Sequence, residues 1–324
     1  MTRRAIVRGV GHYLPKRIVP NSYFETIVET SDEWIQTRSG IKQRHFAAEG
    51  ETTSQMATHA AKAALEDAGI SVRDIDAVIV ATTTPDLTFP ATATIVQEAL
   101  GMERGFAFDV QAVCAGFIFA LVNANALIAT GSADRVLVIG AETFSRLLDM
   151  TDRSTCVLFG DGAGAVVLEA QASTGTNADR GILASDLNSD GRDRDMLYVD
   201  GGPSTTGTTG VVKMLGNQLF RRAVERLTET GHHALGKAGL SDNDIDWIVP
   251  HQANIRIIQG TAKKMGVSMD KVIVTVQNHG NTSAASIPLA LSVGKAEGKI
   301  QEGDLILTEA IGGGLAWGSV VLRW

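Results

Sequence analysis

Three residues of types that carry out nucleophilic and acid–base chemistry follow short apolar segments of the chain. Cys114 comes after Phe108-Asp-Val-Gln, His251 ends Ile248-Val-Pro, and Asn281 follows Gly280. A cysteine placed between a strand and a helix meets unpaired backbone N–H groups and the positive end of the helix dipole, which favour thiolate over thiol. Cys114 is therefore a candidate nucleophile, with His251 and Asn281 as its candidate partners.

Each of these residues also has a purely structural interpretation. A free cysteine is a common small core residue, His251 could be a structural hydrogen-bonding residue, and Asn281 could be an N-cap. The predicted position of all three residues at strand ends favours one shared pocket, because ligands of open α/β sheets bind near the carboxyl ends of strands. The second cysteine, Cys156, is expected in an apolar strand that begins Cys156-Val-Leu-Phe.

The elements that must position these residues come from an internal duplication. Residues 64–76 and 234–246 share 8 of 13 residues at a shift of 170. Both copies predict a helix end, a glycine C-cap, an Asp-rich turn and then a strand. Further along, Phe108-Asp-Val-Gln matches Val274-Thr-Val-Gln, each predicted as a strand before a low-charge helix. Cys114 then corresponds to Gly280.

Each half thus predicts strand, helix, strand, helix, strand, strand, with strands apolar enough for burial on both faces of a mostly parallel sheet. Two stacked sheets with the almost uncharged helix 114–129 between them give an α/β fold of five layers. The halves are predicted as residues 1–170, with the cysteine, and 171–324, with the histidine and asparagine. Residues 171–216, rich in Gly, Ser and Thr, are expected to join the halves as surface excursions.

Composition narrows the class of protein. The chain has 324 residues, 44% of them hydrophobic, and a formal net charge of −7, which argues against nucleic acid as a partner. Its first residues lack a signal-peptide pattern, so we expect a cytoplasmic protein. Residues 110–133 carry no charge over 24 positions but include several polar residues, so we expect a buried helix and not a membrane span.

Glycine-rich segments and histidines suggest neither a nucleotide site nor a metal site. Phe159-Gly-Asp-Gly-Ala-Gly-Ala precedes a strand and not a helix, which excludes the dinucleotide-binding pattern. The run after Ile311, Gly312-Gly-Gly, could bring backbone N–H groups close to a substrate oxygen, although a tight turn explains it equally well. The remaining histidines have no metal-ligand spacing.

In order along the whole chain, several motifs resemble those of β-ketoacyl-acyl carrier protein synthase III, a family within the thiolase-like superfamily that initiates type II fatty acid synthesis. The motifs are Ser31-Asp-Glu-Trp-Ile, Cys114-Ala-Gly-Phe, Phe159-Gly-Asp-Gly-Ala-Gly-Ala, Pro250-His-Gln-Ala-Asn-Ile-Arg, Gly280-Asn-Thr-Ser-Ala-Ala-Ser and Gly312-Gly-Gly. The resemblance implies a homodimer of five-layered α/β/α/β/α subunits.

The resemblance also implies a two-stage mechanism. Cys114 attacks the thioester of a short acyl-coenzyme A, while the N–H groups of Cys114 and Gly313 hold the oxyanion. Malonyl-acyl carrier protein then loses carbon dioxide while His251 and Asn281 stabilise the enolate oxygen, and the carbanion attacks the acyl-cysteine. Acyl-coenzyme A and acyl carrier protein are thus the expected partners, coenzyme A is a substrate, and no metal or redox cofactor is implied.

The resemblance implies further residues of the site. Coenzyme A contacts fall on Trp34 and Arg153, which would sandwich the adenine, and on Thr30, Arg38 and Asn254. The acyl pocket involves Ile311 and, from the partner subunit, Phe89. The distribution of charge itself predicts a carrier-protein docking site on a cationic group. Arg221, Arg222 and Arg226 lie in one predicted helix, and Arg256, Lys263 and Lys264 come just after His251. Of these, Arg256 also matches a docking residue of the family. Val113 and Ile311 depart from the residues common in the family, which leaves the acyl-chain length open.

Three alternatives remain at this point. A related thiolase-fold enzyme could make a secondary metabolite or act in the manner of hydroxymethylglutaryl-type enzymes. A papain-like protease shares the order Cys, His, Asn, but its cysteine would stand near a mature N-terminus. A catalytically inactive carrier-protein or coenzyme A binding protein is disfavoured by the intact set of Cys114, His251 and Asn281.

Overall fold

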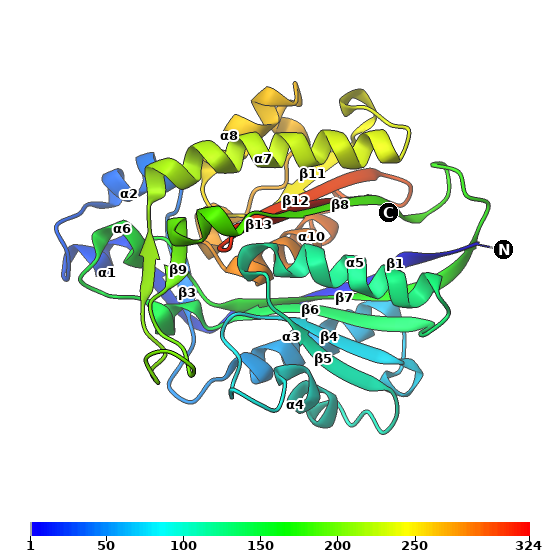
Figure 1. The fold of residues 1–324 in the computed structure, drawn as a ribbon, viewed down its shortest axis with the longest axis horizontal. Helices are drawn as coiled ribbons and strands as arrows, with labels where there is room; N and C mark the ends of the chain where they lie inside the picture. Colours follow the sequence, from blue (N-terminus) through cyan, green and yellow to red (C-terminus); the bar gives the residue numbers. More distant parts are fainter. Residues whose placement is uncertain (1) are drawn as a thin grey trace.

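Two β-sheets lie face to face with helices between them and on both outer faces (Figure 1). The computed structural model describes residues 2–324. The first sheet has the order β1 (Thr2–Tyr13), β7 (Gly162–Ser173), β6 (Arg135–Glu142), β4 (Ala77–Ala81) and β5 (Phe106–Val110), and the second has the order β11 (Trp247–Pro250), β12 (Leu305–Gly312), β13 (Ala316–Arg323) and β8 (Gly181–Ser189).

Helices complete the five predicted layers. Helices α5 (Gly116–Ala129) and α10 (Ser286–Ala296) lie between the sheets; α3 (Thr53–Ala68) and α4 (Thr92–Ala99) cover the outer face of the first, and α7 (Gly216–Lys237) and α8 (Ile255–Lys264) cover that of the second. A smaller N-terminal excursion holds β2 (Arg17–Pro20), α1 (Asn21–Glu25), α2 (Asp32–Ser39) and β3 (Gln43–Phe46). The five-layered α/β fold is confirmed.

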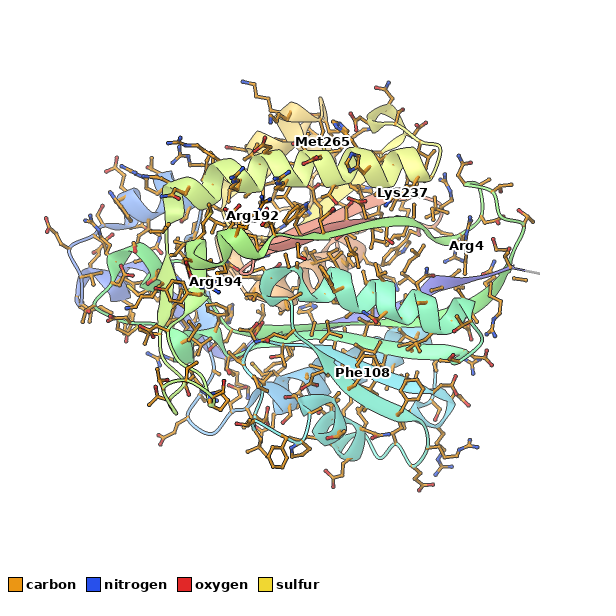
Figure 2. The ribbon with its side chains drawn as sticks, in the orientation of Figure 1. Arg4, Phe108, Arg192, Arg194, Lys237 and Met265 are labelled. Carbon is orange, nitrogen blue, oxygen red and sulfur yellow. The ribbon has the colours of Figure 1, made fainter. Side chains whose placement is uncertain are left out.

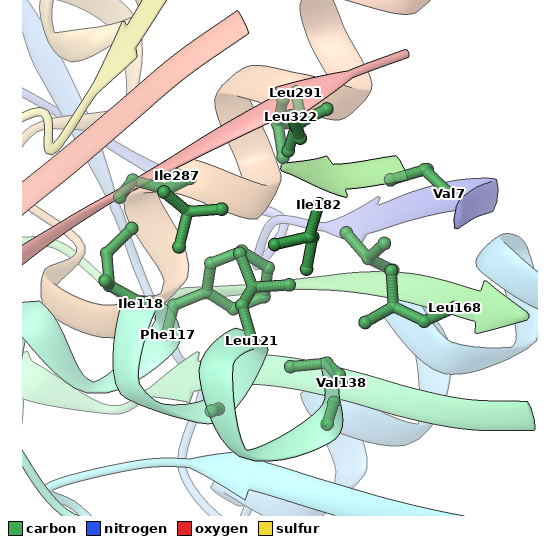
Figure 3. Packing of buried hydrophobic residues seen from close by; sticks show 14 of the residues in the cluster. Val7, Phe117, Ile118, Leu121, Val138, Leu168, Ile182, Ile287, Leu291 and Leu322 are labelled. Atoms are coloured by element: carbon green, nitrogen blue, oxygen red, sulfur yellow. The ribbon is translucent and has the colours of Figure 1, made fainter. Parts of the chain in front are cut away.

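The central helix α5 is buried as expected. Its residues Phe117, Ile118 and Leu121 pack against Val138 and Leu168 of the first sheet and against Leu322 of the second (Figure 3). Within residues 2–324, no helix is long and apolar enough to cross a membrane. The long uncharged stretch therefore reflects packing between two sheets, but the helix is not buried on every side, because Asn123, Ala126 and Ala129 are exposed.

The duplication is visible in the backbone. Two 3-10 turns, η2 (Val113–Ala115) and η7 (Ser283–Ala285), each begin at a non-glycine residue in the left-handed region, with φ of 49° at Val113 and 50° at Ser283. These turns keep the shift of 170, so Cys114 corresponds to Ala284. The predicted match of Cys114 with Gly280 is wrong, because it aligns Phe108 with Val274, a shift of 166, whereas the structure keeps a shift of 170 from β4 through β6. The short helix α9 (Val276–His279) stands where β5 stands in the first copy.

The predicted strand at Val274-Thr-Val-Gln is also wrong, since α9 begins at Val276 and only an isolated bridge between Ile248 and Val272 pairs this segment. The Gln252 side chain explains the change. Its Oε1 accepts from the N–H groups of Thr275 and Val276 at 2.8 and 3.1 Å, and its Nε2 donates to the carbonyls of Pro250 and Ile273. A side-chain amide thus takes the place of a strand partner.

Two smaller expectations fail as well. Residues 171–216 are not only surface excursions, because β8 pairs with β13 along the edge of the second sheet; β9 (Leu197–Val199) and β10 (Val212–Met214) form a separate small sheet. Cys156 ends the short helix α6 (Arg153–Cys156) and is not in a strand, because Asp152 caps the turn by accepting from the Ser154 N–H. The division into residues 1–170 and 171–324 stays a prediction; β7 of the first sheet runs on to Ser173.

Close backbone contact between the layers requires glycine at the end of β6. A Cβ atom on Gly140 would lie 2.2 Å from the Ala284 carbonyl oxygen in η7. We expect Gly140→Ala to lower the free energy of unfolding by about 1–3 kcal/mol, as overpacking of a tight interior does.

Gly236→Ala is the matched control, because Gly236 lies in α7 with no atom within 4 Å of a Cβ there. The control should be neutral or stabilising by up to ~1 kcal/mol. Equal urea-denaturation midpoints for the two variants would contradict this packing.

Candidate active site

A cavity of about 300 Å³ opens between the ends of the strands and the N-terminal excursion. Cys114, His251 and Asn281 all line it, so the structure brings together the three residues that the sequence singles out. Its other lining residues come mainly from α2, α7 and α8 and include Trp34, Arg38, Phe220, Asn254, Arg256 and Ile311. The cavity therefore reaches from the molecular surface to the cysteine.

Cys114 lies in η2 at the start of the interlayer helix, with 2% of its surface exposed. Burial raises the pKa of its thiol to about 12; the Ser283 hydroxyl acts to lower the pKa, and the Glu142 carboxylate acts to raise it. The expected preference for thiolate at the helix N-terminus is therefore outweighed by desolvation. The resting residue is a thiol, and its proton must leave when a substrate reacts.

His251 follows the last residue of β11, and 5% of its surface is exposed. Its Nδ1 lies 2.7 Å from the Ser286 hydroxyl at the start of α10. Burial lowers the pKa of the imidazole to about 3, so the ring is neutral near pH 7. With Nδ1 engaged by Ser286, Nε2 is the ring nitrogen left for a ligand.

The Asn281 side chain is oriented by the turn that follows it. Its Oδ1 accepts from the Ser283 N–H at 2.9 Å, which directs the amide nitrogen away from the turn. The backbone is held on both sides, because Asn281 N donates to the Leu158 carbonyl at 2.9 Å and Gly160 N donates to the Asn281 carbonyl at 3.0 Å. The result is a fixed donor amide at the cavity wall.

A buried arginine supports this backbone contact. Arg44 has no exposed surface and donates to the carbonyls of Val19 and Val157 and to Asn21 Oδ1. Its Cβ fills the space that a side chain would need at Gly160 or Gly280, where an added Cβ would lie 2.9 Å away. The glycine-rich motif at 159–165 therefore allows close packing around Asn281 and has no nucleotide-binding geometry.

The second glycine run packs directly on the nucleophile's turn. A Cβ on Gly312 would lie 2.7 Å from the Cys114 nitrogen and from the Ala112 carbonyl oxygen. Gly313 is buried against the Leu197 carbonyl, and Ile311 before it lines the cavity. Glycine at 312 is therefore required for the run to approach the N–H groups around Cys114.

The outer end of the cavity carries an aromatic ring and cations. The Arg153 guanidinium lies 4.7 Å from the centre of the Trp34 ring, and that of Arg38 lies 5.5 Å from it. Asn254 caps α8 and donates to the Arg38 carbonyl, which ties α8 to α2. Thr30 lies outside the lining; its hydroxyl is buried and has no hydrogen-bond partner within residues 2–324.

The cationic group near the cavity divides into two sets. Arg222 pairs with Asp193 at 3.3 Å and Arg226 with Glu229 at 2.8 Å, so acidic neighbours offset both charges. Arg221, Arg256, Lys263 and Lys264 are exposed and form no ion pair among residues 2–324. Of these four, Arg256 lines the cavity.

Phe89 does not reach the cavity of its own subunit. It lies between β4 and α4 with 83% of its surface exposed, near the exposed Leu87. Among residues 2–324, no group of three or more His, Cys, Asp or Glu side chains is arranged to hold a metal ion.

Sequence reasoning missed Ser283, Ser286, Arg44 and Glu142. The serines look like ordinary residues of a small-residue helix start, and their contacts come from segments far away in the chain. Glu142 offered a signal, since it is a lone acid at the end of the apolar strand 135–141. A charged residue that ends a buried strand must find polar partners inside the protein.

Comparison with known proteins agrees with this arrangement. Residues 108–191 match the model of 3-oxoacyl-acyl-carrier-protein synthase III, and residues 235–324 match the model of the C-terminal part of the same enzymes. A beta-ketoacyl-acyl-carrier-protein synthase III from Cereibacter sphaeroides is 74% identical over 324 residues, covering all of both chains.

Solved structures show the same fold. The 3-oxoacyl-acyl-carrier-protein synthase III of Aquifex aeolicus aligns with a TM-score of 0.93 and 46% identity over 99% of this chain and 100% of its own. The enzyme of the same description from Pseudomonas aeruginosa aligns with a TM-score of 0.93 and 40% identity, covering 99% of this chain and 98% of its own.

Proposed function

The chain belongs to the 3-oxoacyl-acyl-carrier-protein synthase III family, and from this premise we propose how its own residues carry out the reaction. It is an acyltransferase that condenses an acyl-coenzyme A with malonyl-acyl carrier protein, giving 3-oxoacyl-acyl carrier protein, coenzyme A and carbon dioxide at the start of fatty acid synthesis. Membership of this family excludes the papain-like protease alternative. What remains to be assigned is the role of each residue.

Cys114 is the nucleophile of the first half-reaction. Its sulfur attacks the thioester carbonyl of acyl-coenzyme A, and the N–H groups of Cys114 and Gly313 stabilise the tetrahedral oxyanion. The contact of Gly312 with the Cys114 nitrogen supports this role, because it holds the glycine run against the turn. Collapse of the intermediate breaks the bond to the coenzyme A sulfur and leaves an acyl-cysteine next to Ile311.

His251 and Asn281 serve the second half-reaction. When the malonyl carboxylate leaves as carbon dioxide, negative charge develops on the thioester oxygen as an enolate. A neutral His251 can donate from Nε2, and Asn281 can donate from its amide nitrogen. The observation that carries this assignment is the cavity in which these two donors, each with its other polar atom engaged, line the same wall as Cys114.

Trp34 and Arg153 hold the adenine of coenzyme A at the outer end of the cavity. They stack on one another at 4.7 Å, so a planar base can take the place of Arg153 on the Trp34 ring or enter between the two after Arg153 moves outward. Arg38 and Asn254 contribute further contacts along the pantetheine arm, whereas Thr30 lies outside the cavity lining. The apolar walls between these residues and Cys114 suit an uncharged acyl and pantetheine chain.

The active protein is a cytoplasmic homodimer. β5 is an edge strand of the first sheet, and its Phe106 and Phe108 rings stack with centroids 6.4 Å apart; Figure 2 shows Phe108 at this edge. Phe106 and Phe89 are both exposed in the single subunit. A partner pairing along this edge would cover them and bring Phe89 to its acyl pocket.

Acylation should occur at Cys114 alone. Incubation with acyl-coenzyme A should add one acyl group to the wild-type protein and to Cys156→Ala, and none to Cys114→Ala, when intact masses are measured. Cys156 is the matched control because it is also a free buried cysteine, but it does not line the cavity. An acyl adduct that survives Cys114→Ala would overturn the proposed nucleophile.

Arg256 should guide the carrier protein. Acyl carrier proteins are strongly acidic, and a chain of net charge −7 needs local cations at the cavity mouth to attract one. We expect Arg256→Glu to slow condensation with malonyl-acyl carrier protein, most at low ionic strength, and to spare acylation by acyl-coenzyme A.

The charge-matched control is Arg73→Glu, because Arg73 is exposed in the turn before β4, outside the cavity lining. Stopped-flow association at two salt concentrations measures the effect. The docking role of Arg256 is excluded if Arg256→Glu and Arg73→Glu change the association rate and its salt dependence by the same amount.

A further inference from the structure

A buried carboxylate lies behind the nucleophile. Glu142 ends β6 and has no exposed surface. It accepts from the Thr84 hydroxyl at 2.6 Å, from the Thr83 N–H at 3.1 Å and from the Ser283 hydroxyl at 3.1 Å. The second half-reaction as proposed does not use it, yet it is placed at the junction of the two turns.

Ser283 connects this carboxylate to the reacting sulfur. Its hydroxyl donates to Glu142 Oε1 at 3.1 Å, and its turn η7 packs on the turn η2 of Cys114, where Ser283 acts to lower the pKa of the thiol. The φ of 50° holds Ser283 in the left-handed region, a conformation that costs a non-glycine residue free energy. The packed turns therefore place one hydroxyl between the Cys114 sulfur and a buried carboxylate.

Acylation creates the need for a path that carries the thiol proton away. The resting Cys114 is a buried thiol, and the cavity that an acyl-coenzyme A must enter is its route to solvent. Once the pantetheine arm fills that cavity, water cannot accept the thiol proton. An acceptor inside the protein is then required at the moment of attack.

We propose that Ser283 and Glu142 form a proton relay that receives the Cys114 proton during acylation, an assignment that rests on the proposed role of Cys114 as nucleophile. As the sulfur bonds to the acyl carbon, its proton passes to Ser283 Oγ, and the Ser283 hydroxyl proton passes to Glu142 Oε1. Coenzyme A departs as a thiolate and takes a proton from water. In the condensation step the Cys114 thiolate leaves the new product and recovers its proton from Glu142 along the same path.

Glu142 is a better acceptor than His251. Burial raises the pKa of the Glu142 carboxyl to about 7, with the hydrogen bonds from Thr84, Thr83 and Ser283 opposing the rise, whereas the pKa of His251 is lowered to about 3. The groups that face Glu142 are Thr82, Thr83 and Thr84 after β4 and Ser283 and the Ala284 N–H of η7. The ionisable group that interacts with it is Cys114 on η2. The relay thus leaves His251 neutral for decarboxylation.

The test compares two reagents on Glu142→Gln. A short acyl-pantetheine fills the cavity and carries no phosphate that titrates near pH 7. Iodoacetamide is small and leaves the cavity open to water. Rates of Cys114 acylation and of Cys114 alkylation are followed by quenched-flow mass spectrometry at pH 8, with Glu309→Gln as the matched control for loss of a buried acid. The Glu309 side chain is 1% exposed and faces Gly231 of α7.

The relay predicts opposite changes for the two reagents. Acylation of Glu142→Gln should fall ~100-fold or more, as loss of a proton acceptor does, while alkylation should rise because the nearby negative charge that raises the Cys114 pKa is gone. A fall in both rates would show that Glu142 only supports the structure, and a rise in both would show that it only repels the thiolate; either result overturns the relay. If wild-type Cys114 is never acylated, the proposed nucleophile fails instead.

The pH profile provides a second readout. Wild-type acylation should rise as pH increases through about 7, where Glu142 loses its proton. Glu142→Gln should show no inflection there, and His251 and His279, with pKa values lowered to about 3 and 4, cannot supply one. Ser283→Ala interrupts the path with Glu142 in place, so adding it to Glu142→Gln should slow acylation little further. An unchanged inflection in Glu142→Gln would exclude the relay.

Discussion

The turn that carries Cys114 packs against β12 of the second half, and the equivalent turn that carries Ser283 packs against β6 of the first. Glycine makes both contacts possible: an added Cβ would lie 2.7 Å from Cys114 N at Gly312 and 2.2 Å from Ala284 O at Gly140. Each half thus completes its turn on the other half's strand. The active site lies where the two contacts meet, so nucleophile and donors are positioned by packing between sheets and not by a flexible loop.

The two halves have the same turn geometry but carry different reactive residues. The nucleophile occupies the position that Ala284 holds in the second copy, and Ser283 occupies that of Val113 with nearly the same φ. The second copy has the short helix α9 where the first has the strand β5, and Asn281 lies just after that helix. Glu142 lies at the end of β6 where Gly312 ends β12. A symmetric backbone therefore presents sulfur on one side and hydrogen-bond donors and acceptors on the other.

The sequence indicated the five layers, because a repeat at a shift of 170 aligns the strands of the two halves. It indicated Cys114 and His251 because both follow strands, whose ends hold the sites of α/β folds. Asn281 was singled out through a strand that the structure does not contain. The sequence could not show the protonation state of Cys114, which depends on how deeply packing buries the thiol. The segment at Val274 was mistaken for a strand because the Gln252 side chain satisfies its backbone groups. The contact between Ser283 and Glu142 joins residues 141 positions apart, and no local pattern encodes it.

The central claim is that one half of the chain attacks and the other stabilises the enolate. It is tested most directly by following both half-reactions of His251→Ala: Cys114 acylation by intact mass, and carbon dioxide release from malonyl-acyl carrier protein. Loss of one oxyanion donor typically costs ~2.7–4 kcal/mol, so carbon dioxide release should slow ~100- to 1,000-fold while acylation largely persists. An equal loss in both half-reactions would contradict the division of chemistry between the two halves.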